Sequence, residues 1–419
     1  MKFQLSVIIP VWNRWDLTRA CLVSLREHTP GSFMQVIVVD NGSDDETASE
    51  LPAFGDTLFA QGFTLLRNQE NLGFAKACNQ GADAARADLL FFLNNDTLLQ
   101  KGWVAPLLNA FREDGRLGAC GPLLLYPDSN RVQHLGIAFS PTLATEHLYA
   151  NFPADHRVVK LRRSLQAITG AAFMVPKALF EQIGGFYEGY KNGSEDIELC
   201  ARISELGKTL AVFPESRIIH LESQTPSRSD HDVDNAELLN QRCQGAFGPD
   251  LHKHARRDGF DIALTPWLEL FICLPQEEEQ NMTREFAPSF TGGNGLPRFE
   301  IAPGRWWKGV QKEPLWQAGY ELLAAYLESN QQFSEASGLR LLQCNFFPLM
   351  PNFRALAKLA SRAGNQELAE QAVKKVEFIT AQIEDFDTLL DKAGKLSQWA
   401  GRAGERELEE LYRDWLESL

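Results

Sequence analysis

The apolar run at residues 91–93 (FFL) is followed directly by three oxygen-bearing side chains, Asn94, Asn95 and Asp96. A strand buried on both faces reads as a continuous apolar run, so we expect these three residues at the carboxyl end of a strand. Open α/β sheets bind their ligands at that edge. Carboxylate and amide oxygens are ligands of Mg²⁺ and Mn²⁺, so the cluster predicts a site for a divalent cation or a diphosphate. On its own, the same string is also typical of a plain turn.

The pattern of apolar residues predicts the elements that would position this cluster. Two β-branched runs, at residues 5–11 and 34–39, flank a segment with leucine and cysteine at helical spacing, and strands and helices then continue to alternate. Such alternation predicts an α/β fold with a doubly wound, mainly parallel sheet. The expected strands cover residues 5–11, 34–39, 64–67 and 88–93, with helices over 16–28 and 74–86.

A set of strings occurs in an order that resembles the family 2 glycosyltransferases with the GT-A fold. They are SVIIPVWNR, VVDNGSDDET, RNQENLGFAKACNQG, FFLNNDT, TGAAFMVPK, GGFYEGY and SEDIELCARI, and His220 follows them. The resemblance covers roughly residues 3–225. It implies an inverting sugar transfer from a nucleoside-diphosphate sugar, with UDP- or dTDP-linked donors favoured, and a divalent metal, Mn²⁺ or Mg²⁺. The family's usual metal motif is Asp-x-Asp, so residues 94–96 (NND) place fewer charges on the metal.

The resemblance also gives donor-binding roles to side chains in these strings. Asp40 would accept a hydrogen bond from a pyrimidine ring, with residues 10–13 as the facing wall, whereas alone it reads as a turn residue. Gly73 opens a helix whose free N–H groups, together with Lys76, would face the phosphates. Residues 170–171 are small enough for close backbone approach to the donor sugar. The full donor set is Pro10, Val11, Trp12, Asn13, Asp40, Gly73, Lys76, Asn94, Asn95, Gly170 and Ala171.

The metal and the general base are assigned in the same way. Asp96 is the first expected metal ligand because an ionised carboxylate suits Mg²⁺ or Mn²⁺, and Asn94 adds a neutral oxygen or a bridging water. His220 resembles the family's distal metal-binding histidine; outside that context it reads as a core histidine. Asp196 is the expected general base, and Glu195 would hold acceptor or sugar hydroxyls. Both acids begin a segment with helical spacing, where a helix N-terminus stabilises negative charge, and simple capping is the alternative.

Composition limits the kind of protein. The chain has 419 residues and a net charge of −14, without a Lys/Arg-rich block, which argues against a nucleic-acid partner. Its seven cysteines are scattered and form no CxxC pair, so we expect reduced thiols. No stretch reaches the roughly 20 apolar residues that span a bilayer. We therefore expect a cytoplasmic protein, at most peripheral at the inner face of the membrane.

The sequence predicts a GT-A glycosyltransferase domain at residues 1–262, a linker or irregular extension at 263–312 and an all-α domain at 313–419. In the last region Ala336 lies 33 residues before Ala369, close to the ~34-residue period of tetratricopeptide repeats. A short helical array of this kind would bind a protein partner or the acceptor. A generic helical extension packed on the catalytic domain is the alternative.

Together these observations predict an inverting, metal-dependent glycosyltransferase that moves a sugar from a nucleoside-diphosphate sugar to a hydroxyl of a glycan, a lipid-linked oligosaccharide or a protein. One alternative is a decayed transferase that acts as a binding scaffold through its helical domain, which only Asn94 in place of an acid favours. A sugar nucleotidylyltransferase is disfavoured because residues 10–13 (PVWN), and not a glycine-rich phosphate loop, follow the first strand.

Overall fold

The computed structural model describes residues 3–30, 33–191, 193–221, 232–291, 297–299 and 301–418. The chain forms two compact units. The first comprises Met1–Phe139 and Thr145–Gly248, and the second comprises Ser140–Ala144 and Pro249–Leu419. The division after Gly248 lies ahead of the expected domain boundary at residue 262, because the short helix and hairpin that follow Gly248 belong to the second unit.

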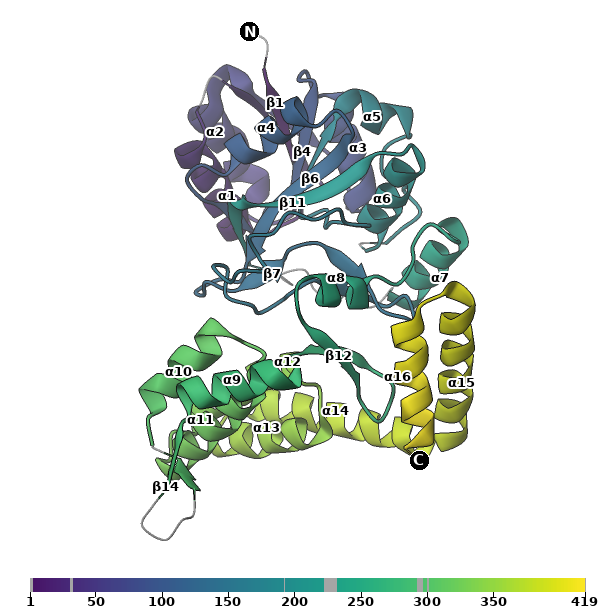
Figure 1. The fold of residues 1–419 in the computed structure, drawn as a ribbon. Helices are drawn as coiled ribbons and strands as arrows, with labels where there is room; N and C mark the ends of the chain where they lie inside the picture. Colours follow the sequence, from purple (N-terminus) through teal and green to yellow (C-terminus); the bar gives the residue numbers. More distant parts are fainter. Residues whose placement is uncertain are drawn as a thin grey trace. The chain divides into compact units, whose positions relative to one another are not determined.

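The first unit is built on one mixed sheet (Figure 1). Its strands are β1 (Leu5–Val11), β2 (Met34–Asp40), β3 (Phe63–Arg67), β4 (Leu89–Leu93), β5 (Thr97–Leu99), β6 (Leu117–Leu125), β7 (Val132–His134), β10 (Ala172–Pro176) and β11 (Thr209–His220). The spatial order is β3-β2-β1-β4-β10-β6-β11-β5, with β7 paired to β6. The first four strands of that order are parallel, whereas β10 is antiparallel to both its neighbours and β5 is antiparallel to β11. The strands β6 and β11 in the other half of the sheet are also parallel. The predicted α/β class is confirmed, with parallel pairs on both sides of the antiparallel strand β10.

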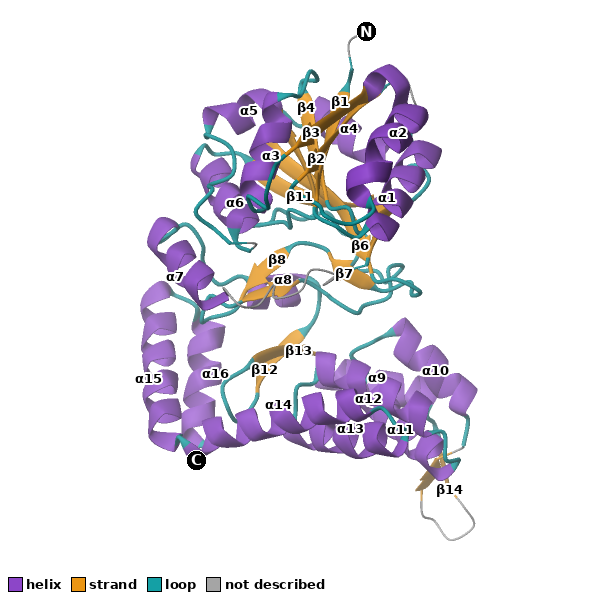
Figure 2. Ribbon diagram, turned by 180° about the vertical axis from the view of Figure 1, so that it is seen from behind, coloured by secondary structure: helices purple, strands orange, loops and turns teal. Residues whose placement is uncertain are grey.

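Helices cover both faces of this sheet. The helices α1 (Trp15–His28), α2 (Thr47–Phe59) and α4 (Val104–Glu113) lie on one face, and α3 (Phe74–Asp83), α5 (Lys177–Gln182) and α6 (Glu195–Glu205) lie on the other (Figures 1 and 2). The alternation of side chains along β1 explains the two layers. Leu5, Val7 and Ile9 join a buried cluster with α1 and α4, whereas Ile8 faces α3. Gly81 of α3 permits that contact, because a Cβ there would lie 2.4 Å from Ile8 Cγ2.

Further short elements complete the first unit. They are the 3₁₀ turn η1 (Ala60–Gly62), the hairpin of β8 (Ile137–Phe139) and β9 (Thr145–His147), and α7 (Asp232–Arg242). The pairing of β5 with β11 has a direct consequence for the site. Its register sets His220 opposite Thr97, so Asp96, the preceding residue, comes close to the histidine although the two are far apart in sequence.

The second unit is mainly helical, as predicted for the C-terminal part of the chain. Its helices are α8 (Leu251–Arg257), α9 (Gln276–Phe286), α10 (Pro303–Lys312), α11 (Gln317–Ser329), α12 (Phe333–Phe346), α13 (Met350–Arg362), α14 (Gln366–Glu384), α15 (Phe386–Ala403) and α16 (Arg406–Glu417). Two hairpins accompany them, formed by β12 (Asp261–Leu264) with β13 (Leu270–Cys273) and by β14 (Ser289–Thr291) with β15 (Pro297–Phe299). Residues 263–312, expected as a linker or irregular extension, thus contain α9 and α10. Within the described part of the chain, no helix is both long and apolar enough to cross a membrane.

Candidate functional site

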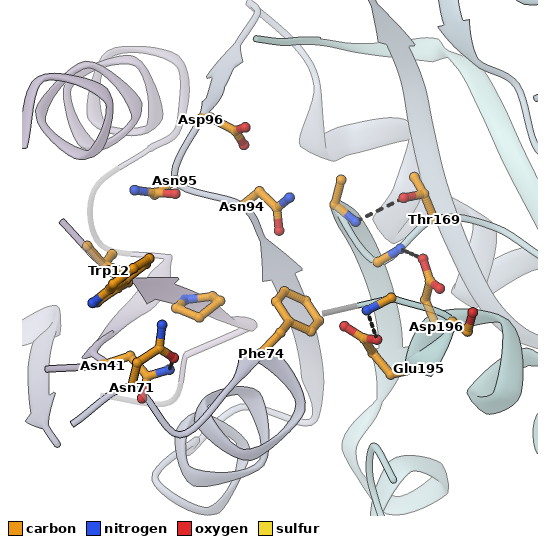
Figure 3. A pocket seen from close by; sticks show the side chains of 16 residues that line it. Trp12, Asn41, Asn71, Phe74, Asn94, Asn95, Asp96, Thr169, Glu195 and Asp196 are labelled. Carbon is orange, nitrogen blue, oxygen red and sulfur yellow. Dashed lines mark hydrogen bonds between the residues drawn. The ribbon is translucent and has the colours of Figure 1, made fainter. Parts of the chain in front are cut away.

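A cavity of about 190 Å³ opens at the carboxyl ends of β1 and β4 (Figure 3). It brings together ten of the residues selected from the sequence, drawn from four separate parts of the chain. These are Pro10, Val11, Trp12, Asn94, Asn95, Asp96, Gly170, Ala171, Glu195 and Asp196. Asn41, Asn71, Phe74, Thr169, Gly193 and Ser194 complete the lining.

Two residues of the expected donor set support neighbouring loops and do not line the cavity. The side chain of Asn13 makes two hydrogen bonds with Asp44. Its Nδ2 donates to Oδ1 of Asp44 at 2.8 Å, and its Oδ1 accepts from the backbone N–H of Asp44 at 2.9 Å. Asn13 therefore connects the end of β1 to the end of β2. Asp40 is buried, lies 3.0 Å from Nη2 of Arg67, and accepts a hydrogen bond from the backbone N–H of Ser43. These contacts shape the loops beside Trp12 and Asn41.

Two further residues of the set lie at the start of α3, also outside the lining. Gly73 precedes the helix at φ 86°, a conformation that favours glycine. Lys76 is exposed on the first turn. Phe74, between them, contributes its ring to the cavity wall and packs edge-on against Phe186.

Asp96 and His220 form a buried pair at one end of the cavity. Oδ1 of Asp96 and Nε2 of His220 are 3.2 Å apart, and neither atom has a hydrogen-bond partner among the described residues. Neighbouring ligands of an octahedral cation bound at ~2.1 Å stand about 3 Å apart, so this separation fits two ligands of one Mg²⁺ or Mn²⁺. The donor set is sparse, since no group of three or more His, Cys, Asp and Glu side chains suited to a metal occurs in the described residues. Asn94, which also lines the cavity, offers a neutral oxygen.

Glu195 and Asp196 lie at the amino end of α6, on the opposite side of the cavity from Trp12 (Figure 3). Ser194 precedes the helix at φ 71° and turns the chain into it. Oδ2 of Asp196 accepts a hydrogen bond from the backbone N–H of Gly170 at 2.7 Å, and Oε2 of Glu195 accepts one from Gly193 at 2.7 Å. Both carboxylates are therefore held by main-chain donors at a helix end that favours negative charge.

A buried ion cluster anchors α6 behind this pair of acids. The carboxylate of Glu198, 2% exposed, bonds to Arg202 one turn on and to Arg242 of α7. Nη2 of Arg242 lies 2.7 Å from Oε1 of Glu198, and its guanidinium packs 3.5 Å over the ring centre of Tyr187. A buried carboxylate satisfied by two guanidinium groups resists displacement, so this cluster fixes the direction of α6.

Asparagine side chains that sequence reasoning missed build the floor of the cavity. Nδ2 of Asn41 donates to Oδ1 of Asn71 at 2.8 Å, while Oδ1 of Asn41 accepts from the amide of Asn68 and from the backbone N–H of Leu72. Both asparagines lie next to residues that the sequence had selected, because Asn41 directly follows Asp40 and Asn71 lies two residues before Gly73. Amides in such positions read as turn residues until the fold brings the two loops together.

The cysteines offer no nucleophile to the site. The Sγ of Cys21 lies 3.6 Å from the hydroxyl of Thr97, and burial raises the pKa of this thiol to about 12. Burial likewise raises the pKa of Cys78, whose helix borders the cavity. All seven thiols are free. The reactive groups that the cavity lining offers are therefore carboxylates and amides.

The family of this first unit follows from comparison with known proteins. Residues 6–184 match the model of Glycosyl transferase family 2, and residues 152–224 match the N-terminal domain of galactosyltransferase. The chain carries a family 2 glycosyltransferase domain. This domain contributes the cavity, because both matches together span the strands and helices that line it.

Relatives of the family 2 domain come from distant organisms. The chain is 28% identical over 227 residues to the O-antigen biosynthesis protein RfbC of Myxococcus xanthus, covering 52% of this chain and 17% of that protein. It is 28% identical over 218 residues to the pre-mycofactocin glycosyltransferase of Mycobacterium tuberculosis, covering 51% and 42%. It is 29% identical over 229 residues to human polypeptide N-acetylgalactosaminyltransferase 12, covering 52% and 39%. The chain thus spans less than half the length of these relatives.

Two solved glycosyltransferase structures superpose on this chain with TM-scores below 0.5. GalNAc-T7 with UDP, GalNAc and Mn²⁺ has a TM-score of 0.46 at 20% identity, covering 56% of this chain and 48% of that one. The mannosyltransferase PcManGT from Pyrobaculum calidifontis, in complex with GDP-Man and Mn²⁺, has a TM-score of 0.42 at 16% identity, covering 92% and 88%.

Proposed function

We propose that the family 2 domain transfers a sugar, with inversion, from a nucleoside-diphosphate sugar to a hydroxyl group of a glycan, a lipid-linked oligosaccharide or a protein. The observation that carries this proposal is the composition of one cavity. Its lining combines Asp96, paired with His220, and the two acids Glu195 and Asp196. Such a transfer requires both charge stabilisation at the leaving diphosphate and a base for the acceptor proton.

The donor would lie between the β1 end and the floor of amides. Trp12 is 41% exposed and lines the cavity, so its ring is free to contact an apolar face of a nucleobase or sugar. Asn41 and Asn71 line the same floor. Pyrimidine donors, UDP- or dTDP-linked, are our first choice, although Asp40, which is buried and paired with Arg67, does not line the cavity and holds the loop instead of the nucleobase.

Asp96 and His220 would hold a divalent cation, Mn²⁺ or Mg²⁺, with Asn94 as a neutral third ligand. The cation, when bound, supplies positive charge that stabilises the departing diphosphate. Lys76, exposed on the first turn of α3, would add to the neutralisation of phosphate charge. Burial of the Asp96–His220 pair keeps competing water away from the metal ligands.

Asp196 would accept the proton of the acceptor hydroxyl, and the resulting oxygen nucleophile would attack the anomeric carbon in a single displacement. The hydrogen bonds from the backbone N–H groups of Gly170 and Ile197 orient the carboxylate. Glu195 would hold an acceptor or sugar hydroxyl. Gly170 and Ala171 leave the backbone open beside them for the donor sugar.

The choice of acceptor classes rests on the relatives, one named for O-antigen biosynthesis and one for polypeptide N-acetylgalactosaminyl transfer. A decayed transferase that acts as a scaffold remains the alternative. Its only support is Asn94 where an acid is usual, and the paired acids Glu195 and Asp196 count against it.

The test is a panel of nucleotide sugars, screened with Mn²⁺ for a rise in melting temperature and then for donor hydrolysis. Binding to the folded state raises apparent stability by mass action. We expect at least one uridine or thymidine donor to stabilise the protein and to be hydrolysed slowly, with inversion seen by NMR at the anomeric carbon. Binding of donors without turnover by any of them, in the presence of candidate acceptors, would favour the scaffold.

A further inference from the structure

The short strand β7 places Gln133 against His220. The glutamine side chain is buried, with 2% of the residue exposed. Its Nε2 donates to the backbone carbonyl of His220 at 3.1 Å, and its Oε1 lies 2.7 Å from Nδ1 of the His220 ring. Both ends of one amide therefore contact the same residue.

This contact fixes the protonation of the imidazole ring. A carbonyl oxygen can only accept, so the NH₂ end of Gln133 must face the carbonyl of His220. The oxygen end is then left for the ring, and Nδ1 must be the donor. In a neutral imidazole with its proton on Nδ1, Nε2 carries the lone pair.

The lone pair points at a second acceptor. Nε2 of His220 and Oδ1 of Asp96 are 3.2 Å apart, and both are buried without a hydrogen-bond partner among the residues that the structure describes. Two buried acceptors in contact are unfavourable unless a metal cation lies with them or Nε2 itself binds a proton. Ligating histidines commonly donate their other ring N–H to a fixed acceptor, which holds the ring orientation and its tautomer.

We propose that Gln133 is a positioning residue that holds His220 in the Nδ1–H tautomer, with Nε2 presented as a ligand for a divalent cation beside Asp96. The inference rests on the proposed function in one respect, the presence of that cation. Nothing in the family strings predicts this role, because Gln133 lies outside all of them. The competing explanation is a buried amide that only braces β7 against the end of β11.

Two substitutions separate these explanations. Gln133→Met keeps the length of the unbranched side chain but removes both hydrogen bonds. Gln133→Glu keeps an acceptor for Nδ1–H and loses the donor to the carbonyl of His220. Binding of Mn²⁺ alone, without nucleotide or acceptor, is followed by electron paramagnetic resonance, and the tautomer of His220 is read from ring ¹⁵N shifts, assigned with His220→Gln.

We expect the wild-type ring to carry its proton on Nδ1. Gln133→Met should weaken Mn²⁺ binding by about 10–100-fold, the usual loss for a partner of a metal-bound histidine, while Gln133→Glu retains most of the affinity. A wild-type ring protonated on Nε2, or wild-type affinity in Gln133→Met, would overturn the inference, as would equal losses in both variants. If Gln133→Met fails to fold, the tautomer of His220 in the wild type and the Mn²⁺ affinity of Gln133→Glu still test the inference.

Asp96→Ala separates failure of the inference from failure of the proposed function. If Asp96→Ala and the wild type bind Mn²⁺ equally, the cation site itself is wrong, and with it the metal-dependent step of the proposed function. If Asp96→Ala loses Mn²⁺ and Gln133→Met does not, only the role of Gln133 is wrong.

Discussion

The backbone N–H of Gly170 donates to Oδ2 of Asp196 over 2.7 Å, which joins the loop before β10 to the first turn of α6. The two segments approach so closely that a Cβ on Gly170 would lie 3.2 Å from Cβ of Asp196. Glycine at this position therefore does more than line the cavity. It sets the distance between the proposed base and the backbone of the loop before β10.

Gly170→Ala should lower transfer while leaving donor binding nearly intact. A contact of 3.2 Å is tighter than ordinary packing, so Asp196 must shift by a few tenths of an ångström. Small misplacements of a catalytic group are costly, up to about 10²-fold for 1 Å, and we expect a loss of about tenfold in kcat. Gly115→Ala is the matched control, because the exposed Gly115 has open space around the position of a Cβ. Equal turnover in the two variants would show that the Gly170 contact does not position the base.

Asp196→Asn should reduce transfer by about 10²–10⁴-fold, the usual contribution of a general base, with donor affinity almost unchanged. The structure adds a complication to this substitution. Asp196 accepts from Gly170 on Oδ2 and from Ile197 on Oδ1, whereas an amide has one oxygen, so the variant loses one of these bonds. The measurement is single-turnover transfer alongside the melting temperature.

Glu205→Gln, on the exposed end of the same helix, controls for removal of an acid from α6. Glu195→Gln should reduce transfer less than Asp196→Asn. If Asp196→Asn turned over normally in well-folded protein, Glu195 would become the leading candidate for the base.

Asp96→Ala should weaken binding of a nucleoside diphosphate with Mn²⁺ far more than Asn94→Ala, because a carboxylate supplies charge that an amide lacks. Asn94→Ala should not disturb the surrounding structure. The backbone of Asn94 makes the hydrogen bonds to Ala171, Cys21 and Thr97, so truncation of its side chain leaves these bonds in place. Titration calorimetry measures both variants, and similar losses would mean that Asp96 is not the principal ligand.

The sequence predicted the strands and the acidic clusters at their ends because each has a strong local pattern. The buried strand β4 is an unbroken apolar run, and the cluster at residues 94–96 lies at its end as expected. Asn13 shows where such reasoning stops: it lies in an expected motif, but at φ 57° its side chain turns to Asp44. Gln133 was missed because β7 is a three-residue strand, too short for any periodicity, and its contact with His220 spans 87 positions.

The role of the second unit can be tested by truncation after Gly248, where the first unit ends. If the helical unit is a tetratricopeptide-like module that binds a partner or the acceptor, the truncated protein should keep donor hydrolysis and lose transfer to the natural acceptor. Full transfer by the truncated protein would contradict a role in acceptor binding. A truncated protein that no longer folds would point to a structural extension.

His134 gives the first unit an acid-sensitive point. Its Nε2 accepts a hydrogen bond from the backbone N–H of Thr169 at 3.2 Å, so the ring must be neutral. Burial, and next the nearby His147 and His220, lower its pKa well below the ordinary value of 6.5. Below pH 6.5 the unfolded chain therefore binds a proton at His134, whereas the folded chain does not. The free energy of unfolding consequently falls as the pH drops from 6.5 toward the lowered pKa of the folded state.

His134→Gln should flatten this dependence, because an amide oxygen can accept from Thr169 without titrating. Each pH unit within the window is worth about 1.4 kcal/mol for one fully linked proton. Denaturant unfolding at pH 7.5 and 5.5 compares the variant with the wild type and with His28→Gln, which removes a half-buried histidine elsewhere. We expect a smaller loss on acidification in His134→Gln alone. If all three proteins lost stability equally between the two pH values, a neutral His134 would not be the source of the acid sensitivity.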